Sequence, residues 1–163
     1  MAETKFLADA TGSTKRPDLV SVVGIFTFIN TGLFGLLYLF ALFGMMAVSK
    51  MPVDEFVQLI RDAMSSYPLP SEQTDAMEQM AVLFHASGVP LMLIYVVRTV
   101  ARLVGAVGMW RGRKMGFYIY AAAQLVGLFA PHVILPWSML GVFGPLMTVG
   151  ITALYGSQLK RMS

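Results

Sequence analysis

Hydrophobic and polar positions along the chain fall into long blocks. Three blocks contain no charged residue, and they cover 19–48, 79–97 and 115–159. A helix needs about 20 residues to cross a hydrocarbon core of about 30 Å, so each of the first two blocks predicts a membrane-spanning helix. The third block would be about 68 Å long as a single helix, so it is expected to turn back on itself.

The turn inside the third block is predicted between Pro131 and Trp137. Pro131 and Pro136 interrupt a helix, and a tryptophan beside them suits a membrane–water boundary. The fold class expected is therefore all-α, an integral membrane four-helix bundle. A cytoplasmic tail at 1–18 precedes a single membrane domain at 19–163, whose spans are predicted at about 19–47, 79–110, 115–131 and 137–158.

The loop at 49–78, between the first two spans, is predicted to contain an amphipathic outer helix. Pro52 suits the first turn of a helix. Apolar residues then recur at helical spacing, at Val53, Phe56, Val57, Ile60 and Met64. Two interpretations stay open: the helix lies across the bundle or the bilayer surface, or its apolar stripe docks a partner subunit.

Composition agrees with the membrane interpretation. Hydrophobic residues make up 56% of the 163 residues and charged residues only 13%, against about 25% charged in soluble domains. These values exclude an ordinary cytosolic protein. The chain has no cysteine, which excludes disulfides, iron–sulfur clusters and thiolate metal sites.

The distribution of basic residues predicts the orientation in the membrane. Only Lys50 and Arg61 fall on the side of the 49–78 loop, together with most of the acidic residues. The remaining basic residues fall on the opposite side: Lys5, Lys15, Arg16, Arg98, Arg102, Arg111, Arg113, Lys114, Lys160 and Arg161. Because positive loops face the cytoplasm, both termini are expected there. The basic isoelectric point of about 9.3 is thus a topology signal. The net charge of +3 is too small and too unevenly placed to predict a nucleic-acid partner.

Arg98 is the main candidate site residue. Counted from a turn at 111–114, it lies about 18 Å into the membrane, where ionisable residues are rare and functional. The same count puts four polar residues at similar depth, which predicts an intramembrane polar layer of Arg98, Asn30, Thr31, Gln124 and Thr148. No predicted span contains Asp or Glu to pair with the Arg98 guanidinium. Its charge would therefore be solvated by water or paired with a lipid phosphate, an anionic ligand or a partner's carboxylate. The alternative is that both Arg98 and Arg102 extend to the cytoplasmic surface.

No catalytic, cofactor or metal site is expected. His85 and His132 would differ by about 11 Å in depth, which argues against a shared haem. Motifs of zinc proteases, serine hydrolases and phosphate-binding loops do not occur in the sequence. The protein is therefore not expected to be an enzyme.

Three stretches of sequence carry a resemblance. Arg16-Pro17 leads into Val22–Ile29, Gly108-Met109-Trp110-Arg111 leads into Lys114–Tyr120, and Leu154-Tyr155 precedes Leu159-Lys160. The chain resembles uncharacterised small four-span membrane proteins of Bacteroidota bacteria. That resemblance implies a bacterial inner membrane and supplies no functional residues.

Two functions are therefore expected as alternatives. The first is a non-enzymatic accessory or structural subunit of a larger bacterial inner-membrane complex, with the lipid bilayer, other membrane subunits and a bound anionic lipid as partners. The second is a small oligomeric transporter or channel built around the mid-membrane polar layer.

Overall fold

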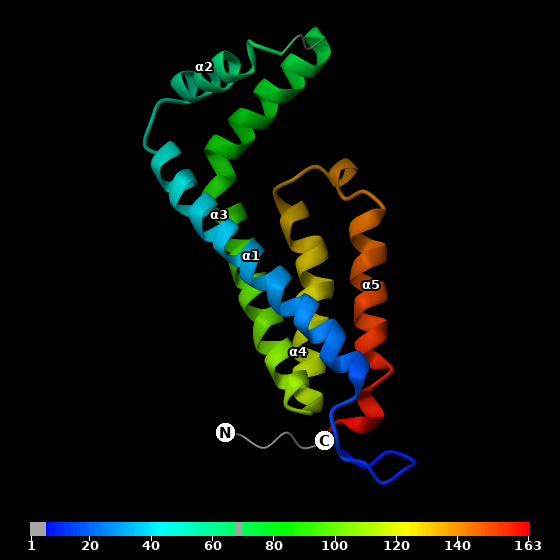
Figure 1. Cartoon of the computed structure of the whole chain (residues 1–163). Helices are drawn as coiled ribbons and strands as arrows, with labels where there is room; N and C mark the ends of the chain where they lie inside the picture. The colour runs from blue at the N-terminus through cyan, green and yellow to red at the C-terminus, as the bar shows by residue number, and fades with distance from the viewer. Residues whose placement is uncertain (1–5, 68–69) are drawn as a thin grey trace. The chain divides into compact units, whose positions relative to one another are not determined.

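The computed structural model describes residues 6–67 and 70–163, and it is all-α, as expected (Figure 1). Its helices are α1 (Asp18–Val48), α2 (Val53–Met64), α3 (Ser71–Trp110), α4 (Lys114–Phe129) and α5 (Phe143–Gly156). Short 3-10 helices follow at Ala130–Val133, Trp137–Met139 and Leu159–Arg161. The chain forms two compact units, one of residues up to 36 and from 94 onward, the other of 37–93, and α1 and α3 each contribute to both.

Three helices in the described part of the chain are long and apolar enough to cross a membrane. They are α1, α3 from Glu72 to Trp110, and the stretch Lys114–Val133 that starts with α4. On α1, Phe26, Phe40 and Phe43 expose 65–72% of their surface. Water-soluble proteins rarely show large contiguous apolar surfaces of this kind. These helices therefore indicate a multi-pass membrane protein.

The predicted fourth span, 137–158, is not confirmed. Gly141 has a φ of +60°, a left-handed conformation that separates the short helix at Trp137–Met139 from α5. Pro145 fits only the first turn of a helix, so α5 begins as late as Phe143. Its 14 residues extend about 21 Å, less than the roughly 30 Å of a hydrocarbon core.

Segments of α1, α3, α4 and α5 meet in the first unit, where α4 and α5 lie side by side (Figure 1). Its core consists of Phe6, Val20, Ala106, Met109, Tyr120, Tyr155 and Met162. Residues Arg16 and Trp110, part of the resemblance noted above, also meet here. The Arg16 guanidinium lies 3.7 Å from the centre of the Trp110 ring, and its Nε donates to the Trp110 carbonyl. Burial lowers the pKa of Arg16.

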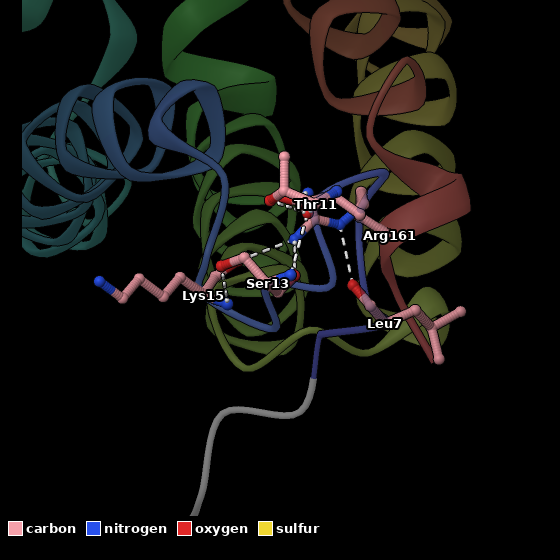
Figure 2. Close-up of polar contacts among 6 residues, drawn as sticks. Leu7, Thr11, Ser13, Lys15 and Arg161 are labelled. Atoms are coloured by element: carbon pink, nitrogen blue, oxygen red, sulfur yellow. Dashed lines mark hydrogen bonds and ion pairs between the residues drawn. The ribbon is translucent and has the colours of Figure 1, made fainter.

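The first unit also joins the two ends of the chain (Figure 2). The Arg161 guanidinium donates to the carbonyl oxygens of Leu7, Ser13 and Lys15 and pairs with the Asp9 carboxylate at 3.0 Å. Phe6 also forms an isolated bridge with Met162, so the tail predicted at 1–18 is held to the C-terminal segment at several points of its described part. Residues 1–5 lie outside the described part.

In the second unit, the apolar stripe of α2 faces its own chain. Phe56 is buried, and Val53, Val57, Ile60 and Met64 are half-buried, while most of the other α2 residues are exposed. Phe56 and Ile60 line an apolar pocket together with Met77 and Phe84 of α3. Arg61 of α2 also pairs with Glu78 of α3 at 2.6 Å. The stripe, for which lying across the bundle or the bilayer surface and docking a partner were the two interpretations, thus helps to hold α2 on α3.

Candidate functional site: a cationic groove

A groove of about 550 Å³ in the first unit gathers most of the predicted polar layer. Its lining residues come from four helices: α1, α3, α4 and α5. The polar part of the lining comprises Thr27, Asn30, Arg98, Arg102, Gln124 and Thr148. The rest is apolar and includes Phe26 of α1 and Phe143 and Met147 of α5. The groove therefore combines a cationic part with an apolar wall.

Neutral amides orient both arginines. Arg98 Nη2 donates to Gln124 Oε1 at 3.3 Å, and Arg102 Nη2 donates to Asn30 Oδ1 at 3.1 Å. Gln124 in turn donates from Nε2 to the Tyr120 hydroxyl at 3.1 Å. Because the bond to Tyr120 fixes the amide nitrogen of Gln124, the amide oxygen is directed toward Arg98. An amide oxygen accepts a hydrogen bond but carries no charge, so these contacts do not neutralise the guanidinium groups.

The charge of Arg102 is incompletely satisfied within the described part of the chain. Its Nε is buried and has no hydrogen-bond partner there. None of the described residues that line the groove is acidic, and residues 19–48 and 79–163 contain no Asp or Glu in sequence. A cation in a low-dielectric environment is costly unless an anion pairs with it.

A buried tyrosine pair supports the groove from α4 and α5. The Tyr120 and Tyr155 rings pack edge to face with centroids 5.1 Å apart, and both side chains are almost fully buried. The Tyr155 hydroxyl lies 3.0 Å from the Thr27 hydroxyl, which links α5 to α1. Gly127 of α4 makes room for Arg98, since a Cβ there would lie 2.5 Å from Arg98 Cγ.

Four of the five residues in the predicted layer line the groove: Asn30, Arg98, Gln124 and Thr148. Thr31 does not belong to it. Its side chain is buried, and its hydroxyl donates to the Thr27 carbonyl of the same helix at 2.7 Å.

Arg102 and Thr27 were missing from the predicted layer, although a signal for both exists in the sequence. Arg102 is four residues after Arg98, and Thr27 is three residues before Asn30. Residues three or four apart share one face of a helix. Counting residues along each helix predicted how deep in the membrane the groove residues lie. A spacing of three or four residues indicates which side chains face the groove.

The two histidines contact backbone carbonyls. His85 Nε2 lies 2.8 Å from the Met51 oxygen in the second unit, and His132 Nδ1 lies 3.2 Å from the Pro136 oxygen in the first. Within residues 6–67 and 70–163, no group of three or more His, Asp or Glu side chains is arranged to hold a metal ion.

Comparison of the chain with protein-family models, curated proteins and solved structures gave no match.

Proposed function

We propose that this chain is a non-enzymatic accessory subunit of a larger bacterial inner-membrane complex. The chain spans the membrane four times, with both termini cytoplasmic and α5 as a short fourth span. The resemblance to small four-span proteins of Bacteroidota bacteria supports this location.

The observation that carries the proposal is the Arg102 guanidinium in a groove without acidic lining residues in the described part of the chain. Residues 19–48 and 79–163 supply no acidic side chain in sequence, so the matching anion comes from another molecule. An anion from a partner subunit, or from a lipid held between the chain and a partner, joins the chain to an assembly. The same groove, repeated around an oligomer axis, is what favours a small transporter or channel as the second candidate.

The test is purification of the tagged protein from its native membrane in a mild detergent. Stoichiometric foreign subunits are the expected result, and Arg102→Gln should reduce their yield. Arg113→Gln is the matched control, because Arg113 is exposed at the start of α4 and its substitution changes the net charge equally. A homo-oligomer without foreign subunits would favour the transporter or channel. A monomer in both detergent and native membrane would contradict both functions.

A further inference from the structure

We propose that the groove binds one amphiphile with a carboxylate or phosphate head group, which Arg102 and Arg98 hold while its apolar chain lies along α1 and α5. This inference identifies the external anion. It rests on the membrane placement proposed above but not on the accessory role.

The cationic part of the groove fits an oxyanion. Arg98 and Arg102 lie one helical turn apart on α3 and line the same cavity. Each donates through Nη2 to an amide, and these two contacts come from different helices, α4 and α1. Guanidinium groups bind carboxylate and phosphate through parallel hydrogen bonds of fixed geometry. A guanidinium carries five N–H donors, and the bond from Nη2 to Asn30 uses one of those of Arg102, so its remaining Nη donors are those that would bind an oxyanion.

The remaining walls fit an apolar chain. Phe26 and Phe143 line the groove and expose 69% and 77% of their surface. Val23, Met147 and Ile151 continue the apolar lining. The volume of about 550 Å³ falls within the roughly 300–1,000 Å³ of small-molecule pockets. A small soluble anion would leave these walls uncovered, and a partner's carboxylate would fill only the cationic part.

The experiment uses the full chain in nanodiscs of phosphatidylcholine and measures binding by native mass spectrometry. Oleate tests a carboxylate head group, dioleoyl phosphatidic acid tests a phosphate head group, and oleyl alcohol is the neutral control. We expect at least one of the two anions to bind about tenfold or more tightly than the alcohol, because hydrogen bonds to a charged group contribute about 1.5–3 kcal/mol.

Two variants locate the binding site. Arg102→Gln should weaken anion binding about tenfold or more, whereas Arg113→Gln should not change it. Met147→Trp keeps the charge and obstructs the apolar wall, so it should weaken both anions as well. Preference for oleate or for phosphatidic acid identifies the head group. The inference is overturned if oleyl alcohol binds equally well, or if Arg102→Gln and Met147→Trp both bind the anions like the wild type. Neither result would affect the co-purification of foreign subunits.

Discussion

Asp9 organises the loop that Arg161 holds. Its Oδ1 accepts a hydrogen bond from the Thr11 hydroxyl at 2.7 Å and further bonds from the backbone N–H groups of Thr11 and Ser13. Together with the weaker attraction of Arg161, these bonds lower the pKa of Asp9 from its ordinary 3.8 to about 2. The ionised carboxylate is thus the form that the folded loop prefers.

We predict that this loop loosens in acid. Because the pKa of Asp9 is lower in the folded loop, its contribution is complete above about pH 4 and is lost as the pH falls through about 2. The measurement is hydrogen exchange of the Leu7 amide, which donates to the Arg161 carbonyl at 2.8 Å. Protection, corrected for intrinsic exchange, should fall over this range in the wild type. It should be weaker and nearly independent of pH in Asp9→Asn, and an identical profile for both would contradict the assignment.

Between elements, the backbones of α3 and α4 approach each other at glycines. A Cβ added at Gly105 would lie 2.6 Å from the backbone nitrogen of Tyr120, and one at Gly108 would lie 2.6 Å from the Cα of Gly116. The helices are joined by a turn in which Gly112 has a φ of +78°. Small residues allow such backbone contact between membrane helices. This contact sets the spacing between Arg98 on α3 and Gln124 on α4.

We predict that Gly105→Ala destabilises the protein by about 1–3 kcal/mol, because the backbone of Tyr120 cannot move aside as a flexible side chain would. Gly32→Ala is the matched control. Its added methyl group would meet no atom within 4 Å, and it should be neutral or stabilise α1 by up to about 1 kcal/mol. Unfolding of the purified proteins in mild detergent measures both. Equal stability of the two variants would show that α3 and α4 are not in backbone contact at this position.

For the molecule as a whole, charge placement predicts the topology. Four spans put both ends of the chain in the cytoplasm and the 49–78 loop outside. If α5 does not cross the membrane, the three remaining spans put the C-terminal end on the side of that loop, which would separate Arg161 from Asp9, the residue with which it pairs.

Alkaline phosphatase fusions distinguish these topologies, because this enzyme is active only outside the cytoplasm. A fusion after Ser65 should be active, and a fusion after Ser163 should be inactive, as the basic residues around Arg111 and Lys160 predict. The fusion after Ser65 serves as the control for expression. Activity after Ser163 would instead support three spans.

The pattern of apolar and polar blocks alone was sufficient for the all-α class, for a helix over the whole of 19–47, for the turn at 111–114 and for the α2 stripe that starts at Val53. These features depend on local properties: the apolar length needed to cross a bilayer, the periodicity of a helix and the chain-breaking of proline and glycine. The late start of α5 has local signals too, in Gly141 and Pro145. The span was nevertheless predicted to begin at 137, because the uncharged apolar run continues past both residues.

Tertiary packing decided which polar residues share the groove. Counting along a helix gives the depth of a side chain but not the direction in which the helix is rotated, and one residue corresponds to about 100° of rotation. Asn30 therefore lines the groove, while Thr31, the next residue, bonds to its own helix. The contact of Arg161 with Asp9, far away in sequence, likewise forms only because packed helices bring the two chain ends together. No local pattern encodes the rotation of a helix or the meeting of distant segments, because the free energy of the whole packed unit determines both.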